Sequence, residues 1–226
     1  MQAKAEIRSW HGLNLLGAYT LAKGLDGQSA DYQGSPVQDP HNLRGERGRT
    51  DIDRHQIFTA SAVYRLSPLR SQPKLLRSLF GDWGIASIFT AQTGQAFNPT
   101  ISTDPANTGT SRRPNRIGSG TLHNAGVNGW FDLSAFSVPL QYTYGNAGRN
   151  ILSGPSLVNS DLGLLKDFRL PLLSENGALE FRAELFDFTN TPHFALPVAN
   201  IQSPGAGRIQ SASDGRDIQF ALKLMF

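Results

Sequence analysis

The chain has 226 residues, of which 39% are hydrophobic and only 17% charged, with 23 Gly and 13 Pro. This composition is atypical of a soluble α/β enzyme and favours short strands joined by turn-rich loops. The net charge of +3 comes from Lys and Arg scattered along the chain, which argues against a nucleic-acid partner, and the absence of Cys excludes disulfides and thiolate metal sites.

Seven stretches alternate apolar with polar residues. The first, residues 3–8, alternates small apolar side chains with Lys4, Glu6 and Arg8. Six more follow at 13–21, 57–66, 83–92, 157–168, 179–185 and 217–226. Alternation with a period of two predicts β-strands with one apolar face, and most of these stretches are about as long as a tilted strand that crosses a bilayer.

Two positions disturb this alternation. Ile88 lies on the polar side of the stretch 83–92, so the assignment of that strand's faces stays open. Lys166 shares the apolar side of the stretch 157–168. We expect Lys166 to extend its ammonium group toward the boundary of a membrane.

The connections alternate in length. Residues 9–12, 67–80 and 169–177 form short connections, and residues 24–53, 96–156 and 188–216 form long ones. Short turns on one side and long loops on the other are typical of up-and-down membrane barrels. A compact soluble domain rarely carries three structureless loops of this length. A soluble sheet with one wet face nevertheless stays an alternative on alternation alone.

Aromatic residues support the membrane interpretation. With strand directions assigned, one group falls near the short turns and a second group near the long loops. Two aromatic girdles flanking an aliphatic band are favoured by the two interfaces of a bilayer. The first group is Tyr64, Trp83, Phe168 and Phe226, and the second is Tyr19, Phe58 and Phe220.

The C-terminal stretch is similar to the β-signal by which outer-membrane proteins are recognised by the barrel-assembly machinery. Its apolar residues occupy every second position up to the terminal Phe: Ile218, Phe220, Leu222, Leu224 and Phe226. An edge strand with such a face can pair with the insertase by β-augmentation. An ordinary terminal strand is the alternative.

Several further blocks occur in order along the whole chain, namely Gln38–Arg44 with Glu46–Gly48, Gly81–Ile85 with Phe89–Gly94, Tyr144–Asn150, Phe181–Phe186, Asn190–Phe194 and Asp217–Lys223. Together these blocks resemble the Oar-like TonB-dependent receptors. The resemblance implies an antiparallel up-and-down transmembrane β-barrel segment, about seven strands of a barrel of about 22. Residues 1–226 would then be its C-terminal portion. The signal peptide, the TonB box and the plug are expected upstream of Met1.

No enzyme is expected from this sequence. The five His are far apart and have no partners at metal-ligand spacing, and no nucleotide or nucleophile motif occurs, so neither a metal site nor a cofactor is predicted. Glu180 and Glu184 lie about 13 Å apart at ~3.3 Å per residue, too far for a glycosidase pair. With Arg182 between them, they are interpreted as charges facing the barrel interior.

The long loops hold the candidate ligand contacts. These are cationic and aromatic residues that could meet an incoming ligand or lipopolysaccharide phosphates, namely Arg112, Arg113, Arg116, Trp130, Phe131, Tyr142 and Tyr144. Packing within the loop is the alternative for the same residues.

The sequence and the resemblance together predict a segment of a receptor for active uptake in the outer membrane of a Gram-negative cell. Its expected partners are outer-membrane lipid, the barrel-assembly machinery and the TonB complex, the last reached through the plug. A passive porin-like barrel and a secreted β-sandwich adhesion or carbohydrate-binding module are the alternatives.

Overall fold

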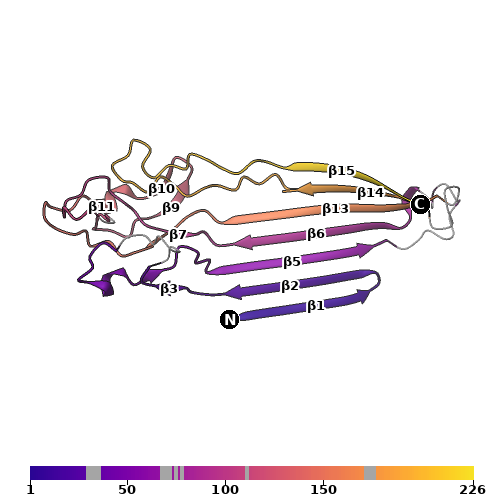
Figure 1. The fold of residues 1–226 in the computed structure, drawn as a ribbon, viewed down its shortest axis with the longest axis horizontal. Coiled ribbons are helices and arrows are strands. Elements are labelled where there is room, and N and C mark those ends of the chain that lie inside the picture. The colour runs from indigo at the N-terminus through magenta and orange to yellow at the C-terminus, as the bar shows by residue number, and fades with distance from the viewer. Residues whose placement is uncertain (29–36, 67–72, 74–75, 77–78, 110–111, 171–176) are drawn as a thin grey trace.

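A computed structural model describes residues 1–28, 37–66, 73, 76, 79–109, 112–170 and 177–226. Seven long strands form one antiparallel sheet in which neighbours in space are also successive long strands in the chain (Figure 1). They are β1 (Gln2–Trp10), β2 (Leu13–Leu21), β5 (Gln56–Arg65), β6 (Trp83–Gln92), β13 (Leu157–Arg169), β14 (Ala178–Phe186) and β15 (Asp217–Met225). The all-β, up-and-down antiparallel arrangement is therefore confirmed.

The strand register brings the apolar sides predicted for the seven strands onto one face of the sheet, here called the apolar face. Leu15, for example, lies opposite Ile7 on one neighbour and Ala62 on the other. Directly opposite residues in a sheet share a face. Ile88 pairs with Ser61 and Asp161, so it lies on the opposite face, here called the inner face. This register settles the assignment that the sequence left open.

The apolar face is uncovered. In the part of the chain that the structure describes, the long strands form a single layer, and the other sheets are two-stranded ribbons. Leu222 and Phe220 are each 69% exposed on this face. A contiguous apolar surface of this kind marks a contact with a partner or a membrane. The β-sandwich alternative, in which two apolar faces would meet, does not agree with this arrangement.

Lys166 is almost fully buried, with 3% of its surface exposed. Its ammonium group donates a hydrogen bond to the Gly81 carbonyl and lies 5.8 and 5.5 Å from the ring centres of Trp83 and Phe168. These contacts satisfy the charge on an otherwise apolar face through a carbonyl and two cation–π interactions. They lie near the short-connection end of the sheet, where a membrane boundary was expected.

The predicted aromatic girdles are only partly matched. Tyr19 and Phe58 lie opposite each other near the long-loop end, as expected. Phe220, however, stacks on Phe181 with ring centres 6.4 Å apart, and Phe181 in turn contacts Trp83 at 6.1 Å. Phe220 is thus in the middle of the apolar band and not at the long-loop rim, because both rings stand mid-strand in the β14–β15 register.

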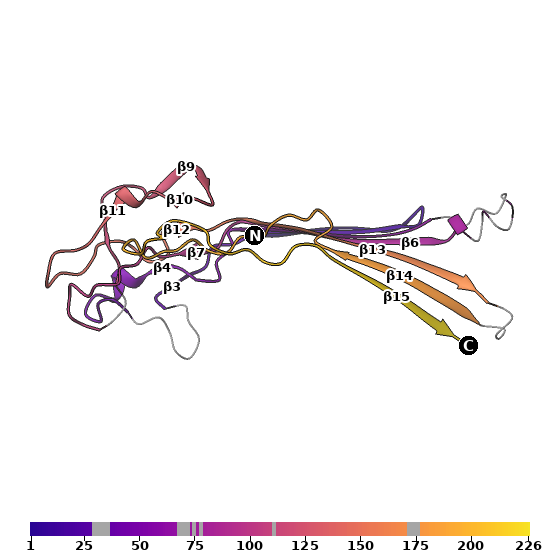
Figure 2. The same cartoon turned by 90° about the horizontal axis from the view of Figure 1, so that it is seen from above.

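The long connections gather at one end of the sheet, and the short connection 9–12 lies at the other (Figure 1). Most residues of the short connections 67–80 and 169–177 lie outside the described residues. The sheet is open, with β1 and β15 as its edges, and β13–β15 turn away from the plane of the other strands (Figure 2). Because seven is odd, the two edge strands run in the same direction. Among the described residues, no helix is long and apolar enough to cross a membrane.

Candidate functional site

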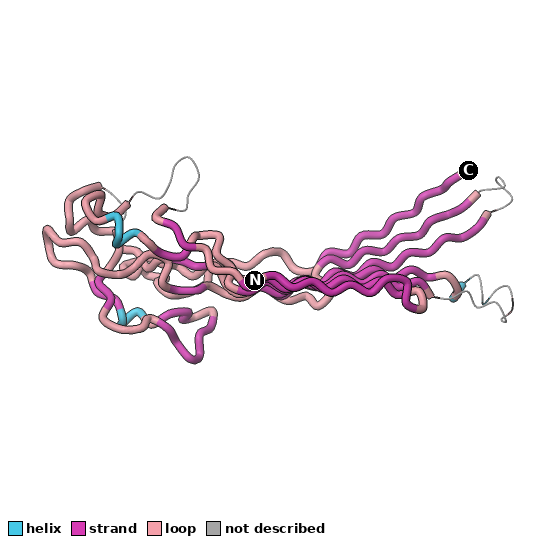
Figure 3. Tube along the Cα trace, turned by 90° about the horizontal axis from the view of Figure 1, so that it is seen from below, coloured by secondary structure: helices cyan, strands magenta, loops and turns pink. Residues whose placement is uncertain are grey.

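The long connections fold into an ordered body, here called the loop domain, formed by described residues of 22–55, 93–156 and 187–216 (Figure 3). It contains the 3-10 helices η1 (Leu43–Glu46) and η2 (Leu133–Ala135) and four two-stranded ribbons. The ribbons are β3 (Leu25–Asp26) with β4 (Gly48–Arg49), β7 (Ala96–Phe97) with β12 (Leu152–Ser153), β8 (Asn115–Arg116) with β11 (Phe136–Ser137), and β9 (Thr121–Gly126) with β10 (Gly129–Phe131). The long connections therefore carry local structure of their own, which the lack of periodicity in the sequence did not indicate.

Among the described residues, a cluster of buried apolar side chains lies in the loop domain. Phe97, Phe131 and Phe136 form its centre, with Ala135 and Leu152 completing it. The Phe97–Phe131 and Phe131–Phe136 ring pairs meet edge to face at 5.8 and 5.9 Å. Such aromatic pairs add to the stabilisation gained from burial alone. A core of its own explains how a segment this long becomes ordered.

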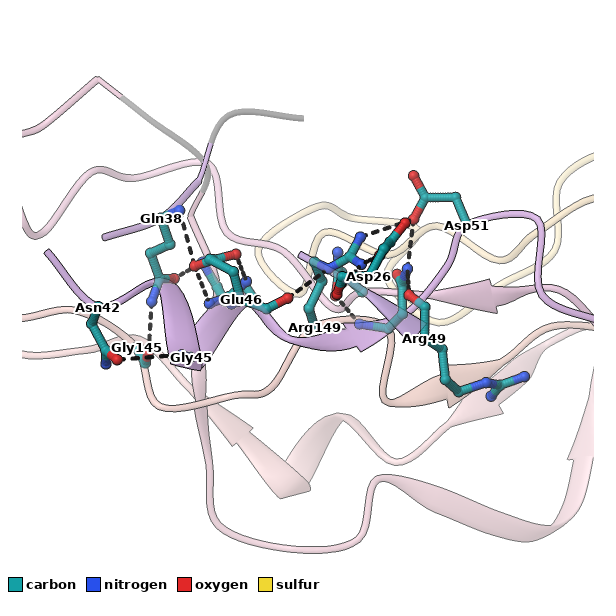
Figure 4. Close-up of polar contacts among 12 residues, drawn as sticks. Asp26, Gln38, Asn42, Gly45, Glu46, Arg49, Asp51, Gly145 and Arg149 are labelled. Atoms are coloured by element: carbon teal, nitrogen blue, oxygen red, sulfur yellow. Dashed lines mark hydrogen bonds and ion pairs between the residues drawn. The ribbon is translucent and has the colours of Figure 1, made fainter. Parts of the chain in front are cut away.

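A buried ion pair joins the first long loop to the second. The Arg113 guanidinium donates two hydrogen bonds, of 2.7 and 2.8 Å, to the two carboxylate oxygens of Glu46. Figure 4 shows Glu46 between Gln38 and Arg149. Glu46 is 3% exposed and Arg113 4%. Gln38 completes the unit, since its N–H donates to Glu46, its Oε1 accepts from the Arg113 N–H, and its Nε2 donates to the Gly145 carbonyl. The bidentate geometry and the extra hydrogen bonds offset the cost of burying two charges.

Arg149 makes a second connection between the same two loops. Its Nε donates to the Glu46 carbonyl at 2.9 Å, and its guanidinium forms ion pairs with Asp26 and, at 3.8 Å, with Asp51. Burial lowers the pKa of this guanidinium. The neighbouring Asn150 donates to the Arg49 carbonyl. Arg149 therefore holds the β3–β4 ribbon against the second loop.

Asp53 anchors the end of the first loop. It is 5% exposed and accepts hydrogen bonds of 2.8 Å from the Gly24 N–H and from Arg49 Nε. Burial raises the pKa of this carboxyl, but the Gly24 hydrogen bond and the Arg49 charge outweigh it, so the pKa lies below its ordinary value. The first loop is thereby fastened at both of its ends.

The third long loop is joined to the second by backbone and amide contacts. The Gln202 Oε1 accepts from the backbone N–H of Ser102 and Thr103 at 2.9 and 3.1 Å. Thr100 forms an isolated parallel bridge with Asn200. All three long loops are thus parts of one body, which the sequence treated as separate connections.

The structure divides the seven predicted ligand contacts into two groups. Arg113 and Phe131 are buried inside the loop domain, where Glu46 and the aromatic core occupy them. Their placement corresponds to the packing alternative. Trp130 packs against the same core and donates from its indole to the Ser153 carbonyl at 2.9 Å.

The remaining predicted contacts stand nearer the surface. Arg112 and Tyr144 line one small hollow, and Arg112 donates to the Ser102 carbonyl at 2.9 Å. Arg116 is exposed and donates to the Gly118 carbonyl. Tyr142 is 79% exposed and has a φ of +63°, a conformation that non-glycine residues adopt at a cost. These four residues remain candidate contacts. Arg113 borders the same hollow as Arg112 and Tyr144, but its guanidinium is occupied by Glu46, and Phe131 lies in the aromatic core away from this hollow.

The sequence reasoning missed Glu46, Gln38 and Arg149 as organisers of the loops. A signal was nevertheless present in two of the resembling blocks, Gln38–Gly48 and Tyr144–Asn150. In the structure these blocks contact each other through the Gln38–Gly145 hydrogen bond and the Arg149–Glu46 hydrogen bond. Their pairing is invisible in the sequence because about a hundred residues separate them.

The inner face of the sheet carries charged side chains near both of its edges. On β1, Glu6 pairs with Arg8 at 2.6 Å and with Lys4 at 3.7 Å. On β14, Arg182 pairs with Glu180 at 3.0 Å and with Glu184 at 3.6 Å. Within the described ranges, no group of three or more His, Cys, Asp or Glu side chains could hold a metal ion.

A comparison with protein families finds one match. Residues 1–219 match a family described as outer membrane beta barrel domain. No curated protein matches the chain. No solved structure matches it either.

Proposed function

Since the chain belongs to the family of outer membrane beta barrel domains, we propose that it is a wall-and-loop segment of a TonB-dependent receptor for active uptake. The chain is located in the outer membrane, and its long strands are transmembrane strands of the barrel wall. The finer assignment rests on the Oar-like sequence blocks and on the loop domain.

The loop domain is the observation that carries this proposal. Its own core and its buried Glu46–Arg113 pair keep the long loops in one defined shape. A rigid recognition surface lowers the entropy cost of binding, which favours a receptor for a scarce ligand over an unselective pore. We propose that Arg112, Arg116, Tyr142 and Tyr144 provide its ligand contacts.

The charged inner face supports a plug inside the barrel. The ladders of Lys4, Glu6 and Arg8 and of Glu180, Arg182 and Glu184 would face such a domain, while the apolar face meets lipid. On this proposal the TonB complex acts through the plug. The β15 apolar set from Ile218 to Phe226 serves the barrel-assembly machinery, and the protein binds no cofactor, acts on no nucleic acid and catalyses no reaction.

Conductance in a planar lipid bilayer tests the proposal. The protein purified from outer membranes in detergent is expected to give no steady ion current, because the plug fills the barrel, and to conduct only when urea displaces the plug. A photo-crosslinker at Arg182 should react with the plug. The same crosslinker at Leu222, on the lipid side, is the matched control and should not. A steady ohmic current without urea would favour the passive porin.

A further inference from the structure

A cleft of about 120 Å³ lies where the barrel wall meets the loop domain. The β6–β13 register places Gln92 opposite Leu157 on the inner face, and both residues line the cleft. The third long loop contributes His193, Phe194 and Leu196. His193 and Leu157 also line a wider hollow further along the inner face, so the cleft opens toward the barrel interior.

Arg54 also lines this cleft, and its guanidinium is partnered differently from those of three other arginines of the loop domain. Arg49, Arg113 and Arg149 each pair with a carboxylate. In the described part of the chain, Arg54 has only a neutral acceptor, the Gln95 Oε1 at 3.1 Å, and its Nη1 is buried without a partner.

The neighbouring carboxylate does not neutralise Arg54, because Asp53 is engaged by Arg49 and by the Gly24 N–H. Burial lowers the pKa of the Arg54 guanidinium more than the charge of Asp53 raises it. An arginine keeps its proton at any physiological pH, so the site carries an incompletely compensated positive charge. Arg54 as a whole is half-buried, but its Nη1 is shielded from water, and a charged group placed in this way is less stable until an anion pairs with it.

The rest of the lining determines what kind of anion fits. Phe194 is 40% exposed and stands with Leu157, Pro155 and Leu196 as an apolar wall. Ligand sites commonly combine such a wall with a few polar groups that fix orientation. A carboxylate or phosphate can accept two hydrogen bonds from the planar guanidinium once the Gln95 amide turns away.

We propose that the Arg54 cleft binds an organic anion, a carboxylate or phosphate carried on an apolar or aromatic body. The anionic group could belong to a free solute or to a lipid headgroup. Such an anion would be the class of ligand taken up, and this physiological role of the cleft rests on the proposed uptake function. Binding of an anion at the cleft does not require TonB coupling, however. The anion site can therefore be absent from a TonB-dependent receptor, and it can be present in a barrel that is not one.

Fluorine NMR of two matched probes tests the proposal. The protein is purified from membranes in an uncharged detergent and titrated with para-fluorobenzoate or para-fluorobenzamide, which differ mainly in charge. We expect the benzoate to bind about 10-fold more tightly or better, the effect of one charge-assisted contact. In Arg54→Gln this preference should disappear. Arg208→Gln, which changes an exposed arginine of the third loop, is the control and should keep it.

Two further arms complete the experiment. Arg54→Lys retains the charge without the planar fork, so part of the preference should survive if the variant folds as the wild type does by circular dichroism. Displacement of the benzoate by lipid A assigns the site to a headgroup phosphate, and displacement by phenyl phosphate alone assigns it to free solutes. Equal binding of the two probes, or a preference that Arg54→Gln leaves intact, overturns the inference.

Discussion

Removal of the Glu46 carboxylate is expected to open the contact between the first and second long loops. In Glu46→Ala, the Arg113 guanidinium stays buried without its two hydrogen bonds of 2.7 and 2.8 Å, and the Gln38 N–H loses an acceptor. Breaking a buried ion pair by deleting one partner costs about 3–5 kcal/mol. The barrel wall makes no part of this contact, so the loss should stay within the loop domain.

Hydrogen exchange converts this cost into a measurable rate. Because each ~1.4 kcal/mol is a factor of ten, the amides of Gln38 and Arg113 should exchange about a hundred- to a few-thousand-fold faster. If the loops are less stable than this, the two amides should lose protection altogether. Amides of β13, such as that of Leu164, should keep their wild-type rates, since their partners lie in β6 and β14.

The double variant Glu46→Met/Arg113→Leu separates charge from packing. Replacing both partners by apolar residues of similar size removes the uncompensated charge, so most of the lost protection should return. Two results would refute the reasoning: exchange in Glu46→Ala within about threefold of wild type, or equal acceleration in β13. The first would mean that the pair is not needed for loop order, and the second that the loops and the wall unfold as one unit.

The strand register at Leu222, the close backbone contact of Gly94 and the lowered pKa of Asp53 each lead to a further prediction. Leu222→Lys on the apolar face should destabilise folding into lipid vesicles by about 2–4 kcal/mol, whereas Ala221→Lys on the inner face should cost much less; equal urea midpoints would contradict the lipid assignment. Gly94→Ala would drive a Cβ into the Gly154 backbone and should expose the loop domain to protease, while Gly17→Ala, with open space around its Cβ, should not. The pKa of Asp53 is lower in the folded protein than its ordinary value of 3.8, so the ionised carboxylate contributes its full stabilisation above pH 3.8 and loses it as the pH falls through the lower folded value. Pepsin should therefore cleave the first loop of the wild type more readily toward pH 2 than at pH 4. In Asp53→Asn this difference between the two pH values should be smaller.

The sequence by itself determined the barrel wall. A period of two is a local property of the chain, and strands joined in order by hairpin-like connections need only neighbouring segments to pair. For that reason all seven strands and the apolar sides of six of them could be predicted, whereas the face on which Ile88 of β6 lies was settled only by the register. Even Lys166, the exception on the apolar side, was expected near a boundary because its long side chain can carry the charge away.

Only the tertiary structure decided the loop domain and the roles of the residues in it. Irregular segments have no periodic signal, so nothing local shows that Glu46 meets Arg113 across 67 residues or that Gln38 meets Gly145 across 107. Arg113 and Arg112 are neighbours of the same type in the sequence, yet one is buried in an ion pair and the other stands near the surface. Burial and pairing of a charge depend on what the fold brings to it from elsewhere, and this is the physical reason that the wall could be predicted while the loops could not.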